Sequence, residues 1–317
     1  MFEPRKLNKP PKPPTTYTID GASYGMDDRL VEAIQSAITR RLESNTLEVP
    51  RLPQVAGRIL QLANNPNSDV DDLVHAITTD PLLVTRILHV ANSAAYGSGM
   101  PVSGLQPAVM RLGSKFVQDM VFAESIRLKI FSARTYRPVL QRSWQTSLAT
   151  AIACEAMSLV TGIEREGAFL LGLLHDTGTP VLVSTIADLE KQNQGRSFGQ
   201  DTVEIVISQL HEDVGAHVLG SWGMSASVVE AARAHHLYLG SGRATPSQQL
   251  VHAGVLICQH LGIGDVQREI NFTVDHAFAD LKLNDMERMT AILETVTREL
   301  ESLMVGLDDG GAHGKAA

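Results

Sequence analysis

The sequence predicts an all-α protein, with an N-terminal helical subdomain followed by a second helical subdomain. Apolar residues recur at three- and four-residue spacing along most of the chain, as on the buried face of a helix. Glycine, proline and capping residues interrupt these runs. No segment alternates polar and apolar residues over a sustained length, as a half-buried strand would. We therefore expect no parallel sheet and no dinucleotide site of the Rossmann type.

Composition and charge narrow the function classes. The 317 residues are enough for one large domain or two small ones, and 44% apolar with 20% charged residues is typical of a globular protein. Lys and Arg number 27 against 35 Asp and Glu, a net charge of −8, and no basic stripe is present. Because DNA binding needs a basic face, we expect none.

The cysteines and the apolar segments indicate the cellular compartment in which we expect the protein. The two cysteines, Cys154 and Cys258, form no CxxC pair and are expected as buried thiols in a reducing environment. The basic N-terminus is not followed by the apolar segment of a secretory signal. The most apolar stretch, Ala168 to Leu174, is far shorter than the roughly 20 residues of a membrane span. We expect a cytoplasmic protein that does not bind a membrane.

The N-terminal part begins with a leader. Residues 1–25 are rich in proline, so we expect a disordered tether, with a polyproline docking segment as the alternative. Residues 26–48 contain an amphipathic helix, because apolar residues recur at intervals of four. These residues are Leu30, Ile34, Ile38 and Leu42.

A compact group of short helices is expected next. Apolar spacing predicts helices over 55–63, 70–77 and 81–91. Ser68 or Asp69 can cap the second helix, and Asp80 followed by proline favours the start of the third.

Longer helical runs follow, over residues 104–131 and 139–160. Further helices are expected over 164–174, 201–210, 213–222, 225–236, 246–261 and 285–304. Residues 263–305 are expected as a C-terminal helical extension, either part of the core or a separate appendage that binds a partner. Residues 306–317 are small and polar, as in a disordered tail.

Five residues that can bind metal occur in a suggestive order. A neutral imidazole and a carboxylate together bind divalent transition ions, and a carboxylate can bridge two of them. The alternative is that histidines near helix ends act as capping or hydrogen-bonding groups. The five candidates are His175, Asp176, His211, His235 and His236. The structural role is assigned to the others, His75, His89, His217, His252, His260, His276 and His313.

The chain also resembles a known family, the HDOD domain, an HD-related output domain of bacterial signalling proteins. The resemblance covers about residues 50–262 and includes the specific phrase ANSAAYG followed by AVMRLG. The matching segments are LPQVAGRILQLANNP at 52–66, DPLLVTRILHVANSAAYG at 80–97, VSGLQPAVMRLG at 102–113, FLLGLLHDTGTPVL at 169–182 and HEDVGAHVLGSWGMSASVVEAARAHH at 211–236. The resemblance implies an HD-like second subdomain.

The same resemblance implies an incomplete catalytic site. Catalytic HD enzymes carry an earlier histidine, where this chain has Thr146, and a late aspartate, where it has Ala253 and Gly254. The lysine that follows the His-Asp pair in the HD-GYP branch is replaced by Thr179. Threonine is a poor metal ligand and carries no charge. We expect a vestigial site, with at most weak affinity for Fe, Mn or Mg.

The resemblance implies a non-catalytic signalling scaffold that acts through protein–protein interaction. Its partners would be other signalling proteins, and self-association into a homo-oligomer stays open. One alternative is a metal-dependent phosphohydrolase or phosphodiesterase that recruits a carboxylate from Glu155, Glu204 or Glu212. The other is a receptor that binds a nucleotide without cleaving it.

Overall fold

The protein is described here by a computed structural model of the whole chain. The described residues are 17–19, 22–24, 28–93, 96–97, 100–131, 133, 135–163, 167–236, 243–264 and 266–308. They divide into two compact units, a smaller one of Met1–Glu48 with Ser184–Gln209 and a larger one of Val49–Val183 with Leu210–Ala317. Helices account for nearly all regular structure in this part of the chain, so the all-α prediction is confirmed.

The smaller unit contains a hairpin that the sequence analysis missed. Strands β1 (Tyr17–Ile19) and β2 (Ala22–Tyr24) pair antiparallel. They fall inside the predicted leader, whose other residues lie outside the described part of the chain. The Asp-Gly pair between them is typical of two-residue hairpin turns. Helix α1 (Asp28–Glu43) follows as predicted, and Leu30, Ile34 and Ile38 of its stripe are buried.

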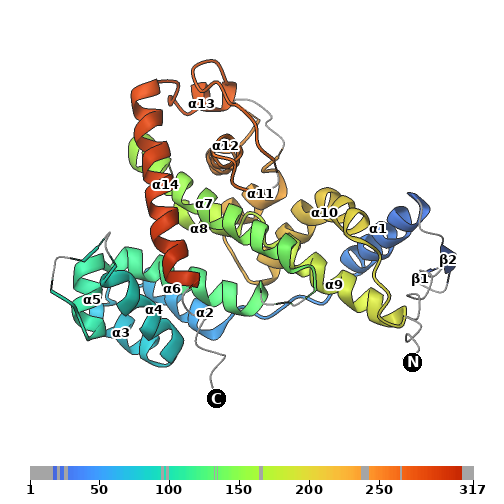
Figure 1. Cartoon of the computed structure of the whole chain (residues 1–317), viewed down its shortest axis with the longest axis horizontal. Coiled ribbons are helices and arrows are strands. Elements are labelled where there is room, and N and C mark those ends of the chain that lie inside the picture. Colours follow the sequence, from blue (N-terminus) through green and yellow to red (C-terminus); the bar gives the residue numbers. More distant parts are fainter. Residues whose placement is uncertain are drawn as a thin grey trace, which may run out of the picture. The chain divides into compact units, whose positions relative to one another are not determined.

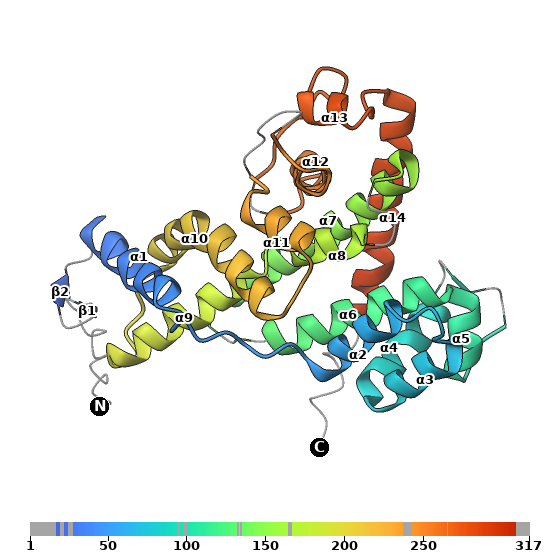
Figure 2. The ribbon, with the colours of Figure 1, turned by 180° about the vertical axis from the view of Figure 1, so that it is seen from behind.

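The larger unit begins with a group of five helices, which Figures 1 and 2 show gathered together. They are α2 (Gln54–Ala63), α3 (Val70–Thr78), α4 (Pro81–Ala91), α5 (Leu105–Leu112) and α6 (Ser114–Ile130). Asp69 and Asp72 form a capping box at α3, and the Asp80 side chain caps α4. The run expected over 104–131 is two helices, because Gly113 adopts φ +87°, which ends the first.

The second group of helices is built on the long helix α7, which contacts α8, α12 and α14. Its members are α7 (Arg137–Thr161), α8 (Ala168–Leu174), α11 (Ala226–Arg233), α12 (Pro246–His260), α13 (His276–Asp280) and α14 (Met286–Asp308). Cys154 on α7 and Cys258 on α12 are buried free thiols, as predicted. The predicted tail begins too early, because α14 continues to Asp308, and residues 309–317 lie outside the described residues.

Two helices differ from the sequence-based prediction. Helix α9 (Gly178–Gln192) was not predicted, because Pro180 and several β-branched residues lower the helical signal of its sequence. Proline is tolerated there because the first-turn N–H groups have no intrahelical acceptor. Helix α10 (Gln200–Ser221) is continuous where two helices were expected, because its packing overrides the weaker local pattern between them.

Two glycines allow the close helix contacts that build the site. A Cβ atom on Gly172 of α8 would lie 2.5 Å from the Cα atom of Ala151 on α7. A Cβ atom on Gly178 would lie 1.9 Å from the carbonyl oxygen of His211 on α10. The turn between α8 and α9 therefore rests directly on the backbone around His211, which only glycine permits.

One stretch, Ala168–Gln192, is long and apolar enough by composition to cross a membrane. It contains α8 and α9, and 89% of its apolar window is buried inside the protein. Helices in the core of a protein are buried to this extent, whereas a membrane span would expose apolar side chains to lipid.

Candidate metal centre

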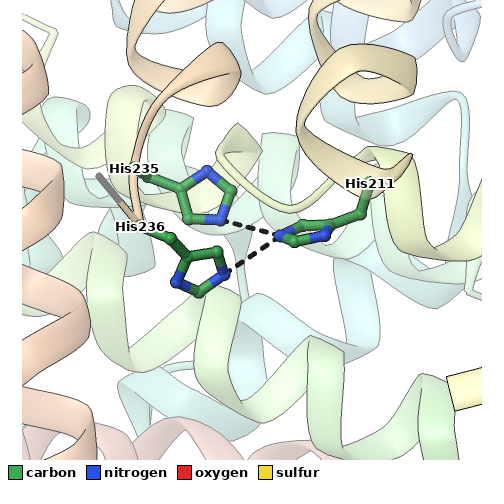
Figure 3. A group of neighbouring side chains, drawn as sticks. All are labelled: His211, His235 and His236. Atoms are coloured by element: carbon green, nitrogen blue, oxygen red, sulfur yellow. Dashed lines mark hydrogen bonds between the residues drawn. The ribbon is translucent and has the colours of Figure 1, made fainter. Parts of the chain in front are cut away.

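Three of the five predicted candidates form one cluster, which we call the histidine triad: His211, His235 and His236. His211 lies on α10, and the other two directly follow α11 (Figure 3). The Nε2 atom of His211 lies 3.1 Å from Nε2 of His235 and 3.0 Å from Nε2 of His236. One ligand atom from each ring lies within 4.8 Å of the others. His211 and His235 are buried, whereas His236 is exposed.

Hydrogen bonding decides where the protons of the triad lie. Nδ1 of His235 is 2.9 Å from the carbonyl oxygen of Ala232, which can only accept, so Nδ1 is the donor. Burial lowers the pKa of His235 well below its usual value, so the ring is neutral and Nε2 carries a lone pair. Partial burial and the nearby His211 lower the pKa of His236 to about 4.

The donor set of the triad fits a metal ion. If His211 donates its single Nε2 proton to His235, no aligned proton remains for the contact with His236. If His211 instead accepts from His236, its lone pair faces the lone pair of His235 at 3.1 Å. One contact is therefore unsatisfied in either case. A cation between neutral imidazoles removes this repulsion, and a backbone carbonyl on the opposite nitrogen orients such ligands.

His175 lies beside the triad but is not one of its three ligands. Its ring packs edge-on against the His235 ring, with centroids 4.7 Å apart. Its Nδ1 donates to the carbonyl oxygen of Gly172 at 2.6 Å, which keeps the ring in the tautomer with a free Nε2. Burial lowers the pKa of His175, so this ring is also neutral.

The carboxylate of Asp176 is held by two hydroxyl groups. Ser143 on α7 donates to Oδ2 at 2.5 Å, and Thr179 on α9 donates to Oδ1 at 2.5 Å. The resemblance placed Thr146 where catalytic relatives carry the earlier histidine, whereas the α7 residue that contacts Asp176 in the structure is Ser143. A Cβ atom on Gly264 would lie 2.5 Å from Oγ1 of Thr146, so that hydroxyl faces Gly264. Ser143 and Thr146 lie one helical turn apart on α7. Because neither is a histidine, the sequence alone did not show which of them contacts Asp176.

Of the three carboxylates proposed as replacement ligands, Glu212 is the one placed at the triad. Its Oε1 accepts from the backbone N–H of His236 at 3.0 Å and lies 3.6 Å from Nδ1 of His235. Glu155 pairs with Lys115. Glu204 belongs to the smaller unit, where its side chain accepts from a neighbouring glutamine.

Gly254, at the position of the late aspartate of catalytic relatives, is a packing position in this structure. A Cβ atom on Gly254 would contact Cys154 and Thr150, so this residue serves the packing of α12 on α7.

His252, two residues earlier on α12, has a role that the sequence did not show. Nδ1 of His252 donates to the backbone carbonyl of His235 at 2.8 Å and thereby supports the triad. Spacing gave no signal for this contact, because it depends on how α12 packs.

A helical group followed by an HD-like helical group around a histidine cluster is the architecture of an HDOD domain. The chain belongs to the HDOD domain family, whose model matches residues 49–238. This is a family of signalling-related proteins. An uncharacterized protein of Treponema pallidum (strain Nichols) is 24% identical over 213 residues, 64% of this chain. The chain spans 41% of that relative's length.

Solved structures share the fold. A protein from Shewanella amazonensis SB2B, whose name suggests a metal-dependent phosphohydrolase, has a TM-score of 0.67 at 19% identity. That match covers 86% of this chain and 99% of the other. An HDOD domain protein of unknown function from Geobacter sulfurreducens has a TM-score of 0.63 at 20% identity, covering 89% of this chain and 99% of the other. At these identities the likeness establishes the fold alone.

Proposed function

We propose that this chain is a non-catalytic regulatory module that transmits signals by binding other signalling proteins. The observation that supports this proposal is the state of Asp176, both of whose oxygens accept hydrogen bonds from hydroxyl groups. Phosphoester hydrolysis in HD-type sites needs a carboxylate that binds and bridges metal ions. A carboxylate engaged by Ser143 and Thr179 is poorly available for that role.

The remaining donors favour one ion held by imidazoles. The residues that would hold it are those of the triad, each of which offers a ring nitrogen within 4.8 Å of the other two. Imidazole ligands suit zinc and iron and do not suit magnesium, which prefers oxygen. When bound, such an ion supplies a Lewis acid. In the proposed module its effect is to join α10 to the turn after α11.

The second candidate function is a metal-dependent phosphohydrolase. It is favoured by the convergence of three imidazoles and by the position of Glu212 beside them. In that reading His211, His235 and His236 hold the ion, and Glu212 accepts a proton from water. The name of the Shewanella relative points in the same direction. For this second function, Glu212 would have to give up its hydrogen bond with the backbone N–H of His236 in order to act as a base.

One experiment separates the two functions. The purified full chain is loaded in turn with Zn²⁺, Mn²⁺ and Fe²⁺, its metal content is measured, and hydrolysis of bis(p-nitrophenyl) phosphate and of cyclic dinucleotides is assayed. We expect metal to bind and no turnover above that of Asp176→Ala. Turnover that Asp176→Ala abolishes would overturn the regulatory proposal. Tight dinucleotide binding without product, measured by calorimetry, would instead identify a nucleotide receptor.

The interaction half of the proposal has its own test. Proteins cross-linked to the tagged full chain in its native cells are identified, and each is then purified and mixed with the chain. We expect saturable binding to a signalling protein such as a kinase or a response regulator. If purified candidates fail to bind and the chain forms only homo-oligomers, the scaffold role is wrong.

A further inference from the structure

The histidine triad takes two of its three rings from consecutive residues, His235 and His236. Consecutive side chains point about 100° apart on a helix and to opposite faces of a strand. The two rings nevertheless have centroids 4.3 Å apart, and both meet Nε2 of His211 (Figure 3). Helix α11 has already ended before them, and Ala234 has φ −147° and ψ 40°. The backbone between the two histidines therefore has an orientation that no regular element imposes.

A single peptide group joins these two histidines, and both of its polar atoms are hydrogen-bonded to side chains. Its carbonyl oxygen, which belongs to His235, accepts from Nδ1 of His252 at 2.8 Å. Its N–H, which belongs to His236, donates to Oε1 of Glu212 at 3.0 Å. We call these two side chains, Glu212 on α10 and His252 on α12, the peptide clamp.

The two clamp residues have opposite hydrogen-bonding character. An ionised carboxylate only accepts, and Nδ1 of His252 must donate because a carbonyl oxygen cannot. A reversed peptide would direct its carbonyl oxygen at the carboxylate and its N–H at a donor nitrogen, which is unfavourable at both ends. Rotation of the peptide also changes ψ of His235 and φ of His236, the backbone angles that direct the two rings. The clamp thus favours the one orientation in which both rings meet His211.

The clamp connects the triad to two helices without using its Nε2 atoms. Glu212 directly follows His211 on α10, so the residue next to one ring holds the peptide between the other two. Oε1 of Glu212 also lies 3.6 Å from Nδ1 of His235, which donates to the carbonyl oxygen of Ala232. His252 lies on α12, which packs on α7 and α11. The ring nitrogens that meet at the triad stay available for a ligand.

We propose that Glu212 and His252 are positioning residues that aim His235 and His236 at a metal ion held by the triad. The proposal rests on the proposed function in one respect, namely that the triad holds an ion. It gives the Glu212 carboxylate the task of holding a peptide, and it makes metal affinity depend on a residue of α12. Groups that orient metal ligands typically change metal affinity about 10- to 100-fold.

The test measures the Zn²⁺ affinity of the full chain by competition with a chromophoric chelator. Glu212→Ala and His252→Ala each remove one side of the clamp and should weaken Zn²⁺ binding by about 10- to 100-fold. Glu212→Gln keeps an acceptor oxygen, and His252→Asn keeps an N–H donor close to the place of Nδ1. Both conservative variants should bind Zn²⁺ nearly as tightly as the parent chain. Glu294→Ala, at an exposed position on α14, is the control and should leave the affinity unchanged.

Two further readouts separate positioning from a general loss of structure. In the metal-free ¹⁵N-labelled chain, the amide of His236 should exchange with solvent more slowly in the parent and in Glu212→Gln than in Glu212→Ala. In the Co²⁺-loaded chain, His252→Ala should change the visible absorption spectrum, which depends on coordination geometry. Glu294→Ala should reproduce the parent spectrum. Circular dichroism confirms that each variant is folded.

The outcomes distinguish this proposal from the proposed function. If folded Glu212→Ala and His252→Ala bind Zn²⁺ as tightly as the parent, the clamp is overturned and the regulatory function stands. Equal weakening by Glu212→Gln and Glu212→Ala would also overturn the clamp, because the charge of Glu212 rather than its hydrogen bond would then matter. A parent chain that binds no Zn²⁺ overturns both the metal assignment and the clamp. Turnover by the loaded parent, with the expected order of affinities, overturns the regulatory function and supports the clamp.

Discussion

Ser143 of α7 donates a hydrogen bond of 2.5 Å to Oδ2 of Asp176, and this contact ties α7 to the turn between α8 and α9. It also occupies a carboxylate that catalytic relatives are expected to offer to metal. A side chain that would complete a metal site is thus used to join helices.

The first prediction concerns that bond. Ser143→Ala should lower the free energy of unfolding by about 1.5–3 kcal/mol, because a buried hydrogen bond to a charged group is lost. Urea unfolding followed by circular dichroism measures this. Ser147→Ala, one turn further along α7, is the control. Ser147 is fully buried and its hydroxyl has no partner among the described residues, so its loss should be neutral or stabilising. If Ser143→Ala and Ser147→Ala changed the free energy of unfolding equally, the hydrogen bond from Ser143 to Asp176 would be contradicted.

The second prediction concerns the helix crossing at Gly178. Gly178→Ala should destabilise the protein by several kcal/mol, on the order of 3–5, because the new Cβ would lie 1.9 Å from the His211 carbonyl oxygen. Gly220→Ala on α10 meets no atom within 4 Å and should stabilise the helix by about 0.5–1 kcal/mol. Thermal melting of both variants tests the pair. A tolerated Gly178→Ala would mean that α9 and α10 do not approach so closely.

The third prediction concerns metal at the triad. Zn²⁺ at about one hundred times its dissociation constant should stabilise the protein by about 2.7 kcal/mol, seen as a rise in Tm. His211→Ala should remove most of this rise, because His211 contacts both other rings. The exposed His75 on α3 is the control, and His75→Ala should keep the full response. A response that survives His211→Ala would place the ion elsewhere.

The fourth prediction concerns pH. The pKa of Asp119 is about 7 in the folded protein, above its usual value of 3.8, because the group is buried. The folded state therefore holds a proton that the unfolded state has lost between these values. The stability from this group is complete below about pH 4. It declines by at most about 1.4 kcal/mol per pH unit up to pH 7.

Asp119→Asn removes this titration. Its free energy of unfolding, relative to the parent chain, should rise as the pH increases from about 4 to 7. Urea unfolding at several pH values measures the difference, which cancels the contribution of the histidines common to both proteins. Glu294→Gln should show a difference that does not change with pH. A flat difference for Asp119→Asn would show that the carboxyl titrates normally.

The sequence predicted some features well because they depend on neighbours along the chain. The caps at Asp69 and Asp80 act on N–H groups within the next turn, so both were visible in advance. The buried stripe of α1 follows from helical periodicity. Helix α9 was missed because its burial, not its local propensity, stabilises it.

What the sequence determined by itself is the helical class, the family and the set of residues available for binding a metal. Only the tertiary structure decided which of them meet. The triad histidines converge because α10 and the turn after α11 pack together. Asp176, in contrast, accepts hydrogen bonds from Ser143 and Thr179. The physical reason is that ligand geometry and hydrogen-bond partners depend on contacts between distant segments, and residue spacing carries no information about those contacts.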